Sequence, residues 1–255
     1  MEIRICVAIA SLAFVAGVAG LYLQKLLPEH HTSERSRDMI GAMVGLFSLL
    51  LALVLGTLVG SAYSFYSTQK AELESFATRA IQLDLALAEY GPETTAARVK
   101  MKDTFQVVYD TFWGKNADSL DPVVSLTVAP VIGHLRAMDE YIAALTPQTP
   151  AQRQFAAAAA FNAGLIEQTR LLISLQLASP VSWPLVIVVV SWALILFVGY
   201  GLLSRVNGTT IVALGFGAFA VASAVMLILE LSQPFTGVFR LPAGAFMQML
   251  AAIGP

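Results

Sequence analysis

Residues 41–90 decide the fold, and they read GAMVGLFSLLLALVLGTLVGSAYSFYSTQKAELESFATRAIQLDLALAEY. Within this stretch, residues 41–69 include no charged residue, whereas charged and apolar residues alternate at helical spacing from Lys70 onward. Counting back from Leu73 in steps of four and three reaches Gly41, so one helical face runs through both halves. We therefore predict one continuous helix of about 75 Å, which exceeds the ~30 Å hydrocarbon core of a bilayer.

The apolar half of this stretch is one of four segments long enough to span a membrane. None of the four contains a charged residue, and they cover 5–23, 39–61, 183–203 and 211–229. The loop 25–38 and the turn 204–209 join them into two hairpins. The first segment also resembles a signal peptide, because Arg4 precedes it, but its apolar run is too long and it pairs naturally with the second.

Composition agrees with a membrane protein. Of the 255 residues, 57% are hydrophobic and 13% charged, and the mean hydropathy is +0.72. These values exclude a disordered chain and an ordinary soluble enzyme. A formal net charge of −2 with scattered basic residues argues against nucleic acid as a partner. The single cysteine, Cys6, excludes an intrachain disulfide.

Between the hairpins, apolar residues recur at spacings of three and four, which predicts amphipathic helices. One runs to Tyr90 and stops at Gly91-Pro92, and another begins at a capping box formed by Thr149 and Gln152. The predicted fold class is all-α, with four transmembrane helices in two hairpins and a helical extramembrane domain between them. The predicted division is 1–62 for hairpin 1, 63–182 for the helical domain, and 183–255 for hairpin 2 with a C-terminal segment.

The continuous face is the candidate functional feature of the second span. Its members are Gly41, Gly45, Ser48, Ala52, Leu55, Val59 and Ala62. Small residues at this spacing let helices pack closely in lipid, which is one interpretation. The other is that the face lines a pore, with Leu55 and Val59 forming an apolar constriction.

The sequence carries no motif of a known catalytic site, so we expect no enzyme, no cofactor and no metal site. Asp84 adjoins a predicted packing position, and we expect an ion pair with Arg79 or Arg98. Glu230 follows the fourth span. It is either a functional carboxylate or a span-end residue that reaches water.

Two stretches of the sequence resemble the bacterial bestrophin-like membrane family. They are LDLALAEYGPET at 83–94, followed by Ala97-Arg98, and LELSQPFTG at 229–237. The residues that carry the resemblance are Leu83, Asp84, Tyr90, Gly91, Pro92, Arg98, Glu230, Pro234, Phe235 and Gly237. The order of two spans, helical insert and two spans extends the resemblance over essentially the whole chain.

This resemblance implies kinship with bestrophins, which are pentameric anion channels in animals and have bacterial relatives that conduct cations. It implies a homo-oligomer, of five copies as in the animal channels, whose second span lines a pore for small inorganic ions. No acidic cluster resembles the calcium clasp of the animal channels, and Phe47 and Phe65 represent the expected aromatic neck only thinly. The alternative is a non-conducting scaffold or sensor that assembles through the long helix.

The resemblance also implies a multi-pass protein of the bacterial inner membrane, with the termini and middle domain in the cytoplasm. Lysine and arginine near the span ends number five on the side of the middle segment and four on the other. This difference is too small to set the orientation by charge.

Overall fold

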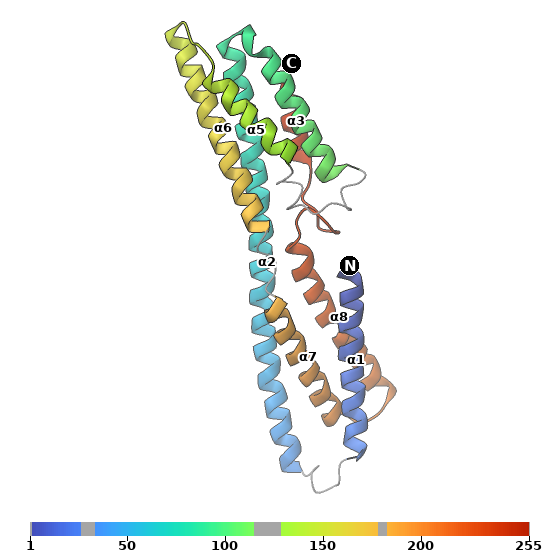
Figure 1. The fold of residues 1–255 in the computed structure, drawn as a ribbon. Helices are drawn as coiled ribbons and strands as arrows, with labels where there is room; N and C mark the ends of the chain where they lie inside the picture. Colours follow the sequence, from blue (N-terminus) through green and yellow to red (C-terminus); the bar gives the residue numbers. More distant parts are fainter. Residues whose placement is uncertain (1, 27–33, 115–128, 178–182, 255) are drawn as a thin grey trace. The chain divides into compact units, whose positions relative to one another are not determined.

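The structure is a computed structural model that describes residues 2–26, 34–114, 129–177 and 183–254. Within these ranges every regular element is helical, which confirms the all-α prediction. The helices are α1 (Glu2–Leu26), α2 (Glu34–Tyr90), α3 (Thr95–Trp113), α5 (Ala129–Ala143), α6 (Pro150–Leu177), α7 (Trp183–Leu203), α8 (Gly208–Leu231) and α9 (Gly244–Ala252) (Figure 1).

The described residues form two compact units. The membrane unit comprises Met1–Phe65 and Val181–Ser232, and the helical unit comprises Tyr66–Pro180 and Gln233–Pro255. Helix α2 contributes to both units without interruption, so the predicted single helix is confirmed. At about 1.5 Å per residue its 57 residues extend for about 85 Å.

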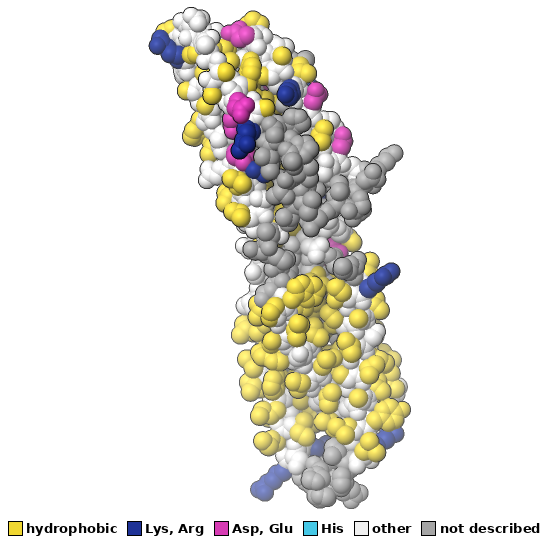
Figure 2. Space-filling model, in the orientation of Figure 1, with side chains coloured by type: hydrophobic (Ala, Val, Ile, Leu, Met, Phe, Trp, Pro, Cys, Tyr) yellow, Lys and Arg dark blue, Asp and Glu magenta, His cyan; other side chains and the backbone are white. Residues whose placement is uncertain are grey.

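The membrane unit contains the four predicted spans. They lie in α1, α2, α7 and α8, which are the four described helices long and apolar enough to cross a membrane. Helix α1 packs closely on α7, where a Cβ added at Gly20 would clash with the carbonyl oxygen of Val198 and one at Gly201 with that of Gly17. Glycine at both positions therefore permits the close contact of the two helices. Apolar side chains cover the visible face of this unit in Figure 2.

The helical unit has a core rich in aromatic residues. Leu83 and Leu87 of α2 meet Phe105 of α3 and Phe246 of α9, and all four side chains are buried. The sequence division placed residues 233–255 with the second hairpin, whereas Gln233–Pro255 belongs to the helical unit. The reason is burial of its apolar side chains, because Phe246, like other apolar residues of this segment, joins that core.

Helix α2 ends at the predicted Gly91-Pro92 break. Gly91 has a φ of 146°, which only glycine adopts readily, and Pro92 opens the short 3-10 helix Pro92–Thr94. The Thr94 hydroxyl binds the carbonyl oxygens of Leu87 (2.5 Å) and Gly91 (2.8 Å). These contacts satisfy acceptors that the end of α2 leaves open.

The predicted capping box is present at the start of α6. The Gln152 amide donates to Thr149 Oγ1 at 3.1 Å, and the Thr149 amide donates to Gln152 Oε1 at 3.3 Å. We expect Thr149→Ala to lower the free energy of unfolding by about 1 kcal/mol, because one helix-terminal donor loses its acceptor. Thr149→Ser keeps the hydroxyl and serves as the control. Denaturant titration of both variants checks this, and equal losses would contradict the role of the cap.

Candidate functional site

The membrane half of α2 is the least covered of the four spans found among the described residues. Only 6% of its most apolar stretch is buried, against 33% for α1, 39% for α7 and 28% for α8. Its buried side chains include Val44 and Leu51, which pack on Val189, Ala193 and Leu196 of α7. Most of the surface of this helix is therefore exposed in the single chain, and it contacts lipid, water or a second protein surface.

The structure divides the face predicted from the sequence into two groups. Gly41 and Gly45 have open space around them, with nothing within 4 Å of an added Cβ, and Ala52 is exposed. Ser48 instead turns toward α7, where its hydroxyl lies 2.7 Å from the Tyr200 hydroxyl and 2.7 Å from the Val44 carbonyl. Leu55 packs against the α7 cluster and Ala62 is buried, while Val59 is half-buried.

Helical spacing places two groups of side chains on the uncovered side of α2 in the membrane unit. The small-residue face consists of the half-buried Gly41 and the exposed Gly45, Ala52 and Gly56, and the large-residue face consists of Met39, Met43, Leu46, Leu50 and Leu53. Leu49, which is 72% exposed, lies between the two faces. Tyr63, which sequence inspection missed, continues the small-residue face five turns after Gly45 and is 63% exposed. Its exposure in the structure, rather than any sequence motif, identifies it.

Other polar and aromatic contacts fix α2 against α7. Arg37 donates to the carbonyl oxygen of Leu203 at 3.0 Å, which satisfies an acceptor at the end of α7. The ring of Phe47 packs edge-on against Trp192, with centroids 6.3 Å apart. Phe47 therefore takes part in packing between α2 and α7 within the chain.

Asp84 and Arg98 form the predicted ion pair in the helical unit. Arg98 Nε lies 2.7 Å from Asp84 Oδ1 and Arg98 Nη2 lies 2.8 Å from Asp84 Oδ2, so the pair is bidentate. The backbone amide of Gly254 also donates to Asp84 at 3.3 Å. The hydrogen bonds with Asp84 raise the pKa of Arg98 above its usual value. This pair therefore joins α2, α3 and the C-terminal segment.

The second family stretch forms a turn that docks on α3. The amide of Leu241 donates to the Pro234 carbonyl at 2.7 Å, and Gly237 has a φ of 79° that favours glycine. Phe235 packs on Phe112 of α3, with ring centroids 5.1 Å apart. The Pro-Phe-Thr-Gly sequence is thus explained by a structural role in the helical unit.

Glu230 lies in the last turn of α8 and is only 2% exposed. A carboxylate so well covered does not reach water within the chain, which rules out the simpler of its two interpretations. It has an interaction partner in the structure. Glu230 therefore stays a candidate functional residue of the membrane unit.

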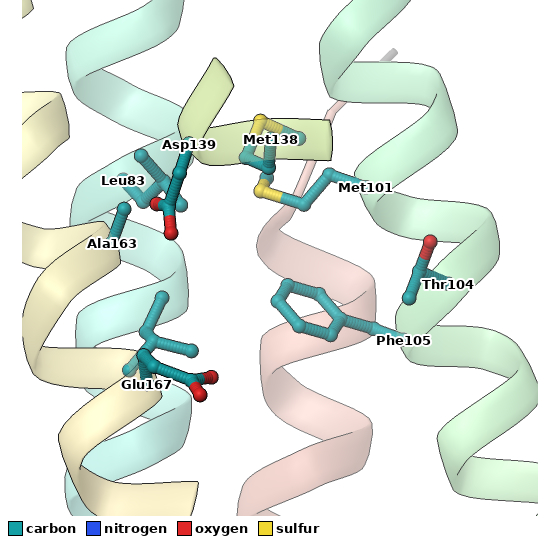
Figure 3. Close-up of a pocket in the computed structure, with 9 residues that line it drawn as sticks. Leu83, Met101, Thr104, Phe105, Met138, Asp139, Ala163 and Glu167 are labelled. Atoms are coloured by element: carbon teal, nitrogen blue, oxygen red, sulfur yellow. The ribbon is translucent and has the colours of Figure 1, made fainter. Parts of the chain in front are cut away.

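Asp139 of α5 and Glu167 of α6 line one pocket of the helical unit (Figure 3). Glu167 is held by Arg170, whose Nε lies 2.8 Å from Glu167 Oε2. Burial raises the pKa of Asp139, and the negative charge of Glu167 raises it further. Asp139 is therefore easier to protonate in the folded chain than in the unfolded chain.

We expect Asp139→Asn to raise the stability at neutral pH by about 0.5 kcal/mol, a small effect because solvent screens this exposed group. The pKa of Asp139 is higher in the folded chain than in the unfolded chain. The stability of the wild type therefore falls as the pH rises from the pKa of the unfolded chain through that of the folded chain. The difference between Asp139→Asn and wild type should therefore vanish below about pH 4. Thermal unfolding from pH 3 to 8 checks this, with Glu140→Gln, on the same helix but outside the pocket, as control. A constant difference across this range would contradict it.

Comparison with known proteins identifies relatives of this fold. A family model described as a Bestrophin-like domain matches residues 11–246. A structure of a bacterial bestrophin homologue from Klebsiella pneumoniae, carrying one substitution, is similar with a TM-score of 0.69 and 13% identity, over 97% of this chain and 98% of that chain. Another structure of a bestrophin homologue from the same organism, phased with zinc, has a TM-score of 0.61 and 15% identity over 97% and 96%.

A third similar structure is that of a membrane protein with one substitution, with a TM-score of 0.68 and 13% identity, over 96% of this chain and 95% of that chain. No curated protein matches the chain. At these identities the structural likeness establishes the fold.

Proposed function

Because this chain belongs to the bestrophin-like family, we propose that it is an ion channel whose second span, in α2, lines the pore. The observation that carries the proposal is the exposure of α2, whose apolar stretch is only 6% buried. A helix that lines a pore in an oligomer contacts its own chain on one side only. Its other sides face neighbouring copies and the ion path.

We further propose a homo-oligomer of five copies in the bacterial inner membrane, with the helical unit and the termini in the cytoplasm. The resemblance to bestrophins supports the number and the orientation. The large-residue face of α2 suits contact with apolar surfaces, whether neighbouring copies or lipid, because Leu and Met dominate it. Small inorganic ions are the proposed cargo.

The small-residue face is the proposed wall of the pore. Gly41, Gly45, Ala52 and Gly56 leave room along most of the span, and bulkier side chains follow at Val59 and Tyr63. A ring of such side chains forms an apolar constriction, which gates ions by excluding water. Ser48 and Leu55 lie beside this wall, on the side of α7.

Ion flux from purified protein tests the proposal. The full chain is reconstituted into liposomes loaded with KCl, and efflux is followed after dilution into an impermeant medium. We expect efflux that scales with the number of oligomers per vesicle. Sealed vesicles that contain folded oligomer would overturn the channel proposal and favour the non-conducting scaffold. A sealed preparation is interpreted only after size-exclusion chromatography shows the oligomer to be intact.

A further inference from the structure

A groove of the helical unit combines acidic groups with an apolar floor. Asp139 comes from α5 and Glu167 from α6, and both line a pocket whose floor includes Leu83, Phe105 and Ile166 (Figure 3). These three apolar side chains are buried. The pocket combines apolar side chains with a few polar groups, as ligand sites do, and its space of about 20 Å³ suits a group no larger than an ammonium.

The two carboxylates are not equivalent. Glu167 forms hydrogen bonds with Arg170, so its charge is largely balanced. Asp139 has neither a hydrogen bond nor an ion pair within the part of the chain that the structure describes. The pocket therefore keeps one uncompensated negative charge at Asp139, close to apolar surface that weakens its hydration.

A larger cavity of about 240 Å³ adjoins this pocket between α3 and α5. The two share Met101, Thr104 and Met138, so they are neighbouring parts of one groove. Methionine side chains adapt their shape readily to apolar ligands. Lys100 and Tyr141 line the adjoining cavity, which places a positive charge in the part of the groove that Asp139 does not line.

We propose that this groove binds a small organic monoamine, with the ammonium group at Asp139 and the apolar chain along Met101 and Met138. The ammonium group forms a charge-assisted hydrogen bond with the free carboxylate. The chain occupies the adjoining cavity, where Ala97 and Ala137 leave room. Lys100 disfavours a second positive charge there. The site lies outside the membrane spans and does not depend on the proposed channel activity.

An inorganic cation is a poorer fit for the same groove. Divalent ions take six or more oxygen ligands, and the described residues contain no group of three His, Cys, Asp or Glu side chains placed to hold a metal. The apolar floor of the pocket can contact the alkyl chain of an amine, whereas a hydrated ion has no apolar surface to place against it. Charge and shape together therefore favour the amine.

Calorimetric titration of the full-length protein in detergent tests the proposal with n-hexylamine as the probe. Hexan-1-ol, which lacks the charge, and 1,6-diaminohexane, which adds a second one, are the comparison ligands. We expect hexylamine to bind about 3- to 5-fold more tightly than either, since the ion pair with the exposed Asp139 is lost in hexanol and Lys100 repels the diamine. Equal heats for hexylamine and hexanol would show partition into detergent only and would overturn the proposal.

Two matched variants identify the site. Because Asp139 is exposed and solvent screens its charge, Asp139→Asn is expected to weaken hexylamine binding about 3- to 5-fold, whereas Glu140→Gln, which removes an equal charge one residue away, leaves it unchanged. Thermal unfolding establishes that both variants are folded. Ala137→Leu should weaken hexylamine more than ethylamine, because it fills the cavity assigned to the longer chain. Wild-type affinity in Asp139→Asn would overturn the proposal.

Discussion

Replacing Arg98 by alanine is expected to lower the free energy of unfolding of the helical unit by about 3–5 kcal/mol. The side chain of Asp84 is only 7% exposed, and the substitution would leave its carboxylate buried without its bidentate partner. The amide of Gly254, at 3.3 Å, is too weak a donor to replace the guanidinium. The C-terminal segment should therefore loosen together with the contact between α2 and α3.

Denaturant titration followed by tryptophan fluorescence measures this loss, because the partly buried Trp113 packs against the core of the helical unit. Arg79→Ala is the matched control, since Arg79 also lies in this unit but only bonds Gln82 at an exposed site. It should change stability by no more than about 0.5 kcal/mol. Substituting both partners, as Asp84→Leu with Arg98→Leu, should recover part of the loss. Equal effects of Arg98→Ala and Arg79→Ala would show that the buried pair does not stabilise the unit.

Local periodicity predicted much of this fold. The four spans, the continuity of α2 and its end at Gly91-Pro92 all depend on residues within a few turns of one another. Of the apolar residues that recur at spacings of three and four in this part of α2, Leu73, Ala80, Leu83, Leu87 and Tyr90 are buried, and Phe76 is half-buried against the same core. The sequence limits the partner of Asp84 to Arg79 or Arg98, and the structure selects Arg98.

Contacts between distant segments could not be predicted in this way. The Trp113 indole donates to the carbonyl of Leu241, and Arg240 donates to that of Phe112, which fastens the C-terminal segment to α3. Neither contact leaves a periodic signal, because its partners are separated by 128 residues. Asp139 and Glu167 also lie on different helices, and no periodic pattern in the sequence predicts that they line the same pocket. Likewise, only the packing of α7 shows that Ser48 and Leu55 turn away from the open side of α2.

Alanine at Val59 or Tyr63 is expected to raise the ion current of the proposed channel by about twofold or more. Each copy would contribute one such side chain to the ring, so a single substitution widens the constriction from every side at once. Removing apolar surface also lets water enter more readily. Tyr63 should show the larger effect, because its side chain is long and mostly exposed in the single chain.

Single-channel recording in planar bilayers measures the effect, and Leu50→Ala is the control. Leu50 lies on the large-residue face, on the far side of the helix from Val59, and its truncation should leave the unitary current unchanged. If Leu50→Ala raised the current and Tyr63→Ala did not, the large-residue face would line the pore and the small-residue face would pack against neighbouring copies. The two faces of α2 are about 120° or more apart at these positions, so one helix cannot present both to a narrow axis.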